Sequence, residues 1–273
     1  MKKQTFISIF INQLKEDPIM DWAATLAYYF MLSIFPLIIF ILTLIPYFNV
    51  DMDMVYLFIN DYAPNELSHL FSTTILEVIS EPKGGLLSFG VLATIWSASN
   101  GVNALIRAVN RSYNIEETRN FFHLRLRSIL ITLGLIVVIV VTLLLPVFGN
   151  VILKGFETLF HVQPETAAIL NILRWVIGIS LMTFVLMIVY WIAPNIKLKL
   201  METSVGALVA TFGWQIISYA FSTYVSNFSN FSATYGSLGG IIILMLWFFL
   251  SGIILVVGGI INASLFLQKQ THR

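Results

Sequence analysis

The longest run of uncharged residues is the feature that most restricts how this chain can fold. Residues 203–268 contain no Asp, Glu, Lys or Arg. A helix needs about 20 mostly apolar residues to cross a bilayer hydrocarbon core roughly 30 Å thick, so this run is too long for one crossing. The polar and aromatic stretch 226–237 divides it. The sequence therefore predicts two membrane-spanning helices here, at 203–225 and 238–267.

Four further intervals with few or no charges predict four more spans, at 22–48, 86–107, 129–151 and 172–194. The composition agrees, because 11% of the residues are charged and 58% are hydrophobic, whereas a soluble domain has about 25% charged residues. A soluble enzyme, a secreted factor and a disordered linker are thereby excluded. We expect an all-α integral membrane protein whose six transmembrane helices form one domain over residues 1–273.

Two segments outside these spans are amphipathic. Residues 50–83 mix acidic and apolar side chains and predict one or two short helices in the first outer segment. Residues 5–14 are apolar and are flanked by Lys2, Lys3 and Lys15. A short apolar helix with basic flanks is typical of a helix that lies on the membrane surface.

The positions of the basic residues predict the orientation of the chain. Cytoplasmic segments carry an excess of lysine and arginine. With six spans and a cytoplasmic N-terminus, all 15 lysines and arginines except Lys83, Lys154 and Arg174 belong to the cytoplasmic side. We therefore expect a multi-pass membrane protein whose two termini both lie in the cytoplasm.

Neutral polar residues recur at helical spacing in three of the predicted spans. The residues that we single out as lining a polar cavity or contacting a substrate are Tyr28, Tyr29, Asn100, Asn103, Gln215, Tyr219, Tyr235 and Asn262. The alternative is that such groups hydrogen-bond neighbouring helices, at roughly 0.6–2 kcal/mol each. The sequence leaves both interpretations open. Gly259 and Ala263 follow the small-xxx-small pattern that lets two helices approach closely.

The basic stretch 107–127 has two interpretations. Arg107, Arg111 and Arg119 are candidates for binding anionic lipid head groups from the cytoplasmic leaflet. The plainer interpretation is that this stretch is a cytoplasmic loop, and that its positive charge reflects only the general excess of Lys and Arg in cytoplasmic loops. Binding of nucleic acid is the least favoured alternative, and we expect none.

Motifs for catalysis are missing from the sequence. It contains no GxxxxGK[ST] loop and no HExxH pair, its four histidines (His69, His123, His161 and His272) are scattered, and it has no cysteine. Nucleotide-binding loops, zinc hydrolases and thiol nucleophiles depend on such residues. We therefore predict that the chain is not an enzyme and needs no metal or other cofactor.

Three segments carry a resemblance to known proteins: DWAATLAYYFMLSIFPLIIF at 21–40, WSASNGVNALIRAVNRSYNIEETR at 96–119 and FSATYGSLGGIIILMLWFFLSGIILVVGGIINA at 231–263. They resemble the YihY family, also named for virulence factor BrkB and historically labelled ribonuclease BN-like. The resemblance implies a bacterial cytoplasmic-membrane protein linked with envelope integrity and with export of lipid or glycolipid material. One position departs from the family, which often has Glu where this chain has Ile260.

These observations lead to two functional hypotheses. The first is a transporter or flippase-like protein that handles a lipid-linked or amphipathic envelope component. The second is a non-transporting scaffold that binds a partner and supports the envelope. The expected partners are membrane lipids, anionic ones included, and a second copy of the chain or another membrane protein. We expect no ribonuclease activity.

Overall fold

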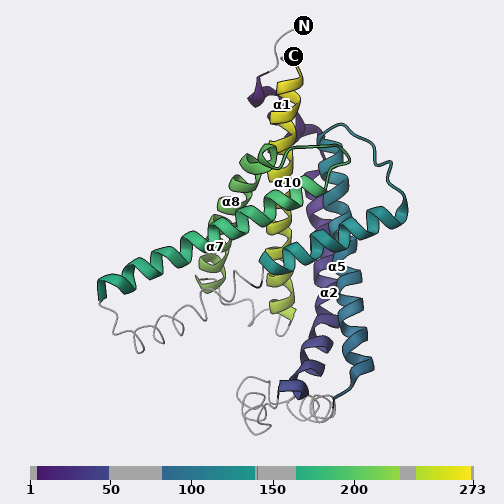
Figure 1. The fold of residues 1–273 in the computed structure, drawn as a ribbon, viewed down its shortest axis with the longest axis vertical. Helices are drawn as coiled ribbons and strands as arrows, with labels where there is room; N and C mark the ends of the chain where they lie inside the picture. The colour runs from purple at the N-terminus through teal and green to yellow at the C-terminus, as the bar shows by residue number, and fades with distance from the viewer. Residues whose placement is uncertain (1–4, 49–81, 139, 141–163, 228–237, 272–273) are drawn as a thin grey trace. The chain divides into compact units, whose positions relative to one another are not determined.

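The computed structural model describes residues 5–48, 82–138, 140, 164–227 and 238–271, and this part of the chain is helical (Figure 1). Its elements are α1 (Phe6–Glu16), α2 (Ile19–Leu44), η1 (Ile45–Phe48), α5 (Gly84–Ser112), a helix at Phe121–Val138, α7 (Pro164–Ile192), η2 (Leu200–Thr203), α8 (Ser204–Asn227) and α10 (Leu238–Thr271).

Six of these helices are long and apolar enough to cross a membrane, which confirms the prediction of an all-α membrane protein. The qualifying segments are Ile19–Leu44, Gly84–Ser112, Phe121–Val138, Trp175–Ile192, Leu200–Asn227 and Gly239–Thr271. The expected N-terminal helix is present as α1. The expected outer amphipathic segment 50–83 lies outside the described residues, apart from its last two.

The third spanning helix begins earlier than the range 129–151 that hydropathy suggests. It begins at Phe121, directly after Asn120, whose side-chain oxygen accepts a hydrogen bond from the backbone N–H of His123 at 3.0 Å. An asparagine in this position caps the first turn of a helix. As a result, Arg125 and Arg127 lie on the helix and not in the loop before it.

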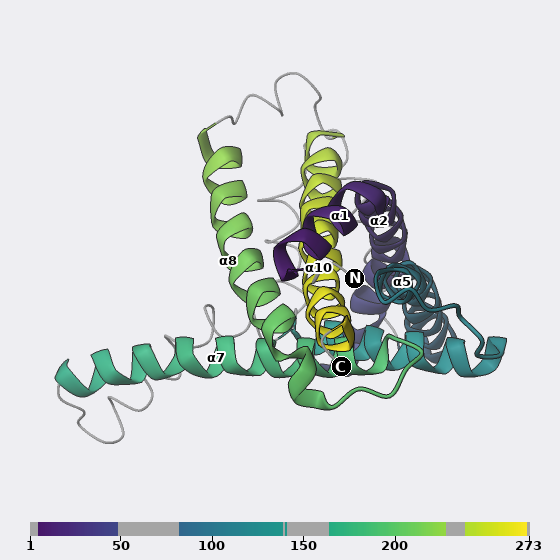
Figure 2. The ribbon, with the colours of Figure 1, turned by 90° about the horizontal axis from the view of Figure 1, so that it is seen from above.

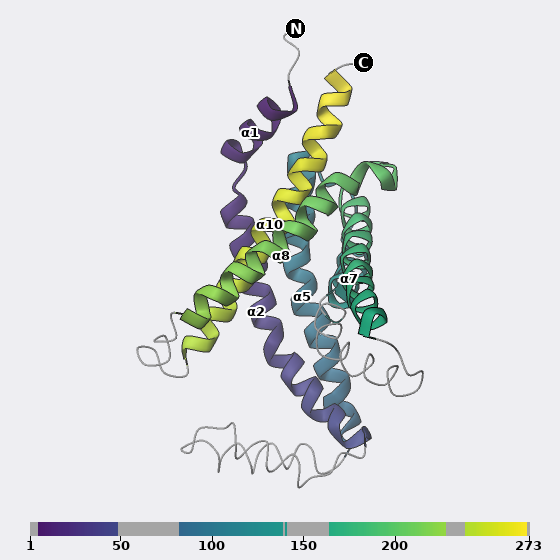
Figure 3. The same cartoon turned by 90° about the vertical axis from the view of Figure 1, so that its left-hand side faces the viewer.

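The chain divides into two compact units, residues 29–98 and the rest. In the first unit, residues 29–44 of α2 and residues 84–98 of α5 run side by side (Figure 3). Their approach is close at Gly90, because a Cβ there would lie 2.9 Å from the backbone nitrogen of Phe40. Buried hydroxyls inside this pair bond to their own helix, as Thr94 does to the carbonyl of Gly90 at 2.6 Å.

In the larger unit, α10 contacts both α8 and α1, and α7 packs against α8. Figure 2 shows α8 and α10 meeting near the N-terminal end of α8. The contact is backbone to backbone, because any side chain on Gly206 would overlap the carbonyl oxygen of Gly258. The hydroxyl of Tyr190 on α7, fully buried, donates to the carbonyl of Leu255 on α10 at 2.8 Å.

The C-terminal end of α5 is closed by a left-handed residue. Asn114 has a φ of 57°. Its N–H donates to the carbonyl of Arg111 at 2.9 Å, and the N–H of Ile115 donates to the carbonyl of Asn110 at the same distance. This paired pattern is the Schellman motif, in which asparagine is an accepted substitute for glycine. The chain is thereby turned sharply after α5, so that residues 115–120 return toward the end of α7.

Candidate functional site

Asn100 and Asn103, two of the predicted cavity residues, meet the third spanning helix. The guanidinium of Arg125 donates to Oδ1 of Asn100 at 2.7 Å, and the hydroxyl of Ser128 donates to Oδ1 of Asn103 at 2.6 Å. Arg125 is 9% exposed. These four residues form what we call the α5 polar cluster. It brings a cation into the contact between two helices that each qualify as membrane spans.

Sequence reasoning missed Arg125, because it was counted as part of a cytoplasmic loop. A signal for it was present. Asn120 is a helix-capping residue. The residues Arg125, Ser128 and Thr132 of the helix that it begins are three and four positions apart, which places them on one helical face. All three side chains are buried.

Asn262, another predicted cavity residue, joins α8 to α10. Its side-chain oxygen accepts from the backbone N–H of Gly206 at 2.8 Å, and its amide donates to the carbonyl of Thr203 at 3.1 Å. The residue is 1% exposed. In this arrangement Asn262 serves as a contact between helices, while the neighbouring Ile260 is fully buried.

The remaining cavity candidates differ in their exposure. Tyr28 and Tyr219 are exposed on their helices, at 55% and 78%. Tyr29 and Gln215 are half-buried, and Tyr235 lies outside the described residues. One turn after Gln215, the hydroxyl of Ser218 is buried and has no hydrogen-bond partner within the described part of the chain. Two of these candidates are therefore exposed and two are half-buried, and all four stay predicted cavity residues.

Of the three head-group candidates, Arg119 is held inside the protein. Its guanidinium binds the carboxylate of Glu117 in a two-pronged contact, at 2.6 Å to Oε1 and 2.5 Å to Oε2, and donates to the carbonyl of Ala193 at 2.8 Å. The Arg119 side chain is 9% exposed and that of Glu117 is 19% exposed. The amide of Asn110 donates to the same carboxylate at 2.8 Å.

These contacts close the C-terminal end of α7. Arg127 donates to the carbonyl of Ile192 at 2.8 Å, and the backbone N–H of Asn195 donates to Oδ1 of Asn110 at 2.7 Å. The last carbonyls of a helix carry partial negative charge and have no partners within the helix, so cations stabilise them. We call Asn110, Glu117, Arg119, Arg127 and Asn195 the α7 cap network.

The pKa of Glu117 reflects this network. Burial of the carboxyl raises its pKa, but the hydrogen bonds from Arg119 and Asn110 and the charge of Arg119 outweigh burial, so the pKa is lowered overall. Glu117 is therefore ionised at neutral pH and forms a charge-assisted pair with Arg119.

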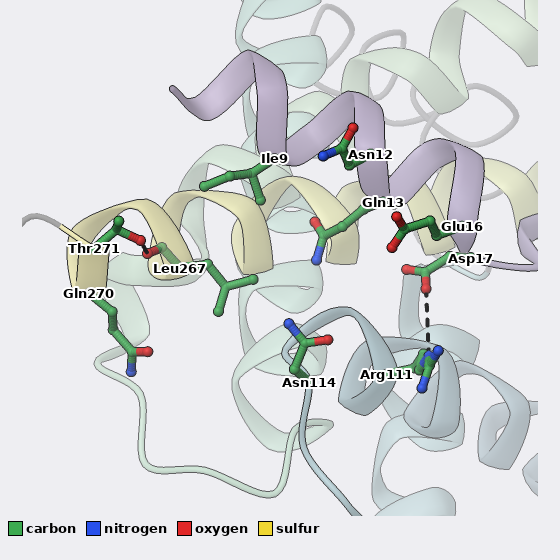
Figure 4. A pocket seen from close by; sticks show the side chains of 10 residues that line it. All are labelled: Ile9, Asn12, Gln13, Glu16, Asp17, Arg111, Asn114, Leu267, Gln270 and Thr271. Atoms are coloured by element: carbon green, nitrogen blue, oxygen red, sulfur yellow. Dashed lines mark hydrogen bonds and ion pairs between the residues drawn. The ribbon is translucent and has the colours of Figure 1, made fainter. Parts of the chain in front are cut away.

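Arg107 and Arg111 are both exposed, and Arg111 lines a pocket of about 420 Å³ (Figure 4). The pocket lies between α1, the end of α5 and the end of α10. Ile9 and Leu267 supply apolar walls, and the polar lining includes Asn12, Gln13, Glu16, Asp17, Arg111 and Gln270. We call it the α1 pocket.

Arg111 and Asp17, which both line the α1 pocket, form a loose ion pair. Nε of Arg111 lies 3.9 Å from Oδ1 of Asp17, and their side chains are 69% and 7% exposed. Burial raises the pKa of Asp17, an effect that the hydrogen bond from Ser112 and the charge of Arg111 reduce without cancelling. Sequence reasoning selected Arg111 but missed Asp17 and Glu16, because their distance in sequence from Arg111 hides that they share a pocket.

Comparison with known proteins finds one family model, described as virulence factor BrkB, that matches residues 10–273. The chain is 45% identical to a protein of Bacillus subtilis (strain 168) named "Putative ribonuclease-like protein YfkH", over 91% of this chain and 90% of the relative. It is 26% identical to a UPF0761 membrane protein of Actinobacillus pleuropneumoniae, over 100% and 98% of the two chains. No solved structure matches the chain.

The ribonuclease-like name belongs to that relative. Among the described residues of this chain, no three His, Cys, Asp or Glu side chains lie close enough together to hold a metal ion. The described part of the chain thus combines helix contacts with the α5 polar cluster, the α7 cap network and the α1 pocket.

Proposed function

Because the chain belongs to the virulence factor BrkB family of membrane proteins, we propose that it moves a lipid-linked or amphipathic envelope component across the bacterial cytoplasmic membrane. The transporter or flippase role is supported above all by the α5 polar cluster. Placing a charged side chain within a membrane-spanning bundle is costly, and such residues mark substrate or ion pathways. Arg125 lies on the helix Phe121–Val138, which is long and apolar enough to be a membrane span, and its guanidinium donates to Asn100 of α5.

The chemistry of the cluster suits a passing polar head group. A guanidinium binds phosphate through paired, charge-assisted hydrogen bonds. Asn100 supplies a neutral oxygen that accepts a hydrogen bond from the guanidinium at 2.7 Å. A phosphate that replaces this neutral acceptor gains the stronger, charged hydrogen bond. Lipid tails stay among the exposed apolar side chains of the surrounding helices.

The test is lipid movement in proteoliposomes with a fluorescent phospholipid, measured by chemical quenching of the outer leaflet. Arg125→Gln and Asn100→Ala are expected to slow movement about 10- to 100-fold, because a hydrogen bond to a charged group contributes about 1.5–3 kcal/mol and each 1.4 kcal/mol is tenfold in rate. Lys197→Gln, at an exposed position of the loop after α7, is the matched loss of one positive charge and should leave the rate unchanged.

Thermal unfolding in detergent shows whether each variant is folded. If Asn100→Ala, Asn103→Ala and Gln215→Ala are all folded and all move lipid at the wild-type rate, the assignment of these residues is wrong. If the wild-type protein moves no lipid, transport itself is contradicted.

A non-transporting scaffold is the second candidate, and Asn262 favours it, because it links α8 to α10 and both its oxygen and its nitrogen are hydrogen-bonded within the protein. The absence of native cysteine makes a labelling test clean. In a transporter, a water-soluble maleimide should label Asn103→Cys and Gln215→Cys as it labels Lys197→Cys. In a dry scaffold, both should stay unlabelled, as the fully buried Ala263→Cys does.

A further inference from the structure

We propose that the α1 pocket binds the head group of a zwitterionic phospholipid, one that carries both a phosphate and a primary ammonium, as phosphatidylethanolamine does. This inference rests on the proposed function, since it names the class of lipid on which the protein acts. It concerns a site separate from the α5 polar cluster, and its volume of about 420 Å³ falls within the range of roughly 300–1,000 Å³ that is usual for small-molecule sites.

The charges that line the pocket are of both signs. Arg111 is the cation, and Glu16 and Asp17 are the carboxylates. A single guanidinium fits one phosphate, and a primary ammonium offers three donors that carboxylates and amide oxygens accept. Two carboxylates disfavour a ligand that is purely anionic, and Arg111 disfavours one that is purely cationic.

Arg111 is able to turn toward a ligand. Its side chain is 69% exposed, and its 3.9 Å separation from Asp17 is longer than a hydrogen bond. Such a pair contributes little in the free protein, so a phosphate that binds Arg111 displaces a weak contact.

The wall of the pocket is fixed before a ligand arrives. The amide of Gln13 on α1 donates to the carbonyl of Ser112 at the end of α5, and the hydroxyl of Ser264 on α10 donates to Oε1 of Gln13 at 2.5 Å. One side chain thereby ties together the three helices that surround the pocket. Preformed sites bind more tightly, because ordering them has no further entropic cost.

The orientation of α1 places the pocket at the depth of lipid head groups. Ile9, Asn12 and Glu16 line the pocket at spacings of three and four, and therefore share one helical face. The opposite face carries Ile7, Ile11 and Leu14, which are 61%, 42% and 38% exposed.

A water-soluble helix would bury these three apolar side chains, yet α1 turns them outward and buries only Ile9 on the face that lines the pocket. The helix is joined through two residues to α2, a membrane-spanning helix. An exposed apolar face at this position fits the boundary between head groups and acyl chains. The lipid surface covers this exposed apolar face, so the face of α1 that lines the pocket borders the head-group layer.

The experiment is native mass spectrometry of the full-length protein in detergent, titrated separately with phosphatidylethanolamine, phosphatidylcholine and phosphatidylglycerol. Phosphatidylethanolamine is expected to bind at least tenfold more tightly than either other lipid. Phosphatidylcholine has no N–H donors on its ammonium, and phosphatidylglycerol has no ammonium. A fourth titration with soluble glycerophosphoethanolamine separates a membrane lipid from a free phosphodiester and should show much weaker binding.

Two variants with matched controls locate the site. Arg111→Gln and Glu16→Gln are each expected to weaken phosphatidylethanolamine binding about tenfold, the factor that 1.4 kcal/mol represents. Lys269→Gln and Glu116→Gln remove the same charges from exposed positions that do not line the pocket, and should bind like the wild type. Gln270→Ala, at an exposed lining position, gives a further readout if either charge variant fails to fold.

Equal binding of the three lipids, or full binding by folded Arg111→Gln and Glu16→Gln variants, would overturn the inference. Equally tight binding of glycerophosphoethanolamine would overturn its assignment to a membrane lipid. Because binding is measured at equilibrium, selective binding without lipid movement contradicts only the proposed transport. Lipid movement with unselective binding contradicts only this site.

Discussion

Gly206→Ala is expected to destabilise the protein by about 3 kcal/mol, the upper end of what overpacking costs in a well-packed core. The added Cβ would overlap the carbonyl oxygen of Gly258 and would lie 2.5 Å from the side-chain nitrogen of Asn262. The first obstacle is backbone, so no side-chain rotation relieves the overlap and the two helices must separate. Separation also strains both hydrogen bonds of Asn262.

Thermal unfolding in detergent, followed by intrinsic fluorescence, measures this effect. Gly240→Ala is the matched control, because it adds the same methyl group to α10 at an exposed position where nothing lies within 4 Å of it. Alanine is the better helix former, by up to about 1 kcal/mol, so this control should be neutral or slightly stabilising. If Gly206→Ala unfolds at the same temperature as Gly240→Ala, the close crossing of α8 and α10 is wrong.

Arg119→Gln is the second substitution with a large expected effect. Removing one partner of a buried ion pair destabilises proteins by about 3–5 kcal/mol, because the other charge stays buried and unpaired. Here the remaining carboxylate is Glu117, and the carbonyl of Ala193 loses its donor as well. We expect a loss of stability near the lower end of this range. The Glu117 side chain is 19% exposed to solvent, and in the variant it still accepts the hydrogen bond from Asn110.

The dependence of stability on pH identifies the cause. The pKa of Glu117 is lower in the folded protein than its ordinary value of 4.5. Its contribution is therefore fully present above that value and is lost as the pH falls through the lower, folded-state pKa. In Arg119→Gln, the loss of the cation raises the pKa of Glu117, so this part of the acid sensitivity should shrink.

Controls separate the pair from general effects of charge. Lys197→Gln, at an exposed position of the neighbouring loop, should unfold like the wild type at every pH. The double variant Glu117→Gln, Arg119→Gln should be more stable than Arg119→Gln alone, since it leaves no buried charge without its partner. Stability of Arg119→Gln equal to that of Lys197→Gln would show that the α7 cap network does not hold the protein together.

The candidate site was predictable only in part. Arg111 and the two asparagines of α5 were selected by charge and by helical spacing, and they do lie in polar surroundings. Arg119 was selected by the same rule, yet it lies inside the α7 cap network. Charge alone does not distinguish these two arginines, because the difference lies in their tertiary contacts: Arg119 is buried against Glu117 and the end of α7, whereas Arg111 is 69% exposed.

The sequence by itself determined the fold class, the presence of six apolar spans and the N-terminal helix. The physical reason is that the length of a span, and the cost of placing a charge in hydrocarbon, apply to each helix separately. The start of the third helix could also have been found, from the capping residue Asn120. Rules of this kind apply to residues that are close together in the sequence and do not depend on contacts with other helices.

Only the tertiary structure decided which polar side chains face one another. Asn262 is enclosed between α8 and α10, while Tyr219 stands exposed on α8, although both belonged to one list of candidates. Lipid is as apolar as the helix surfaces, so hydrophobicity does not choose between one helix contact and another. Close packing at small residues such as Gly206 and Gly258, and the hydrogen bonds that this packing permits, make the choice between residues far apart in the chain.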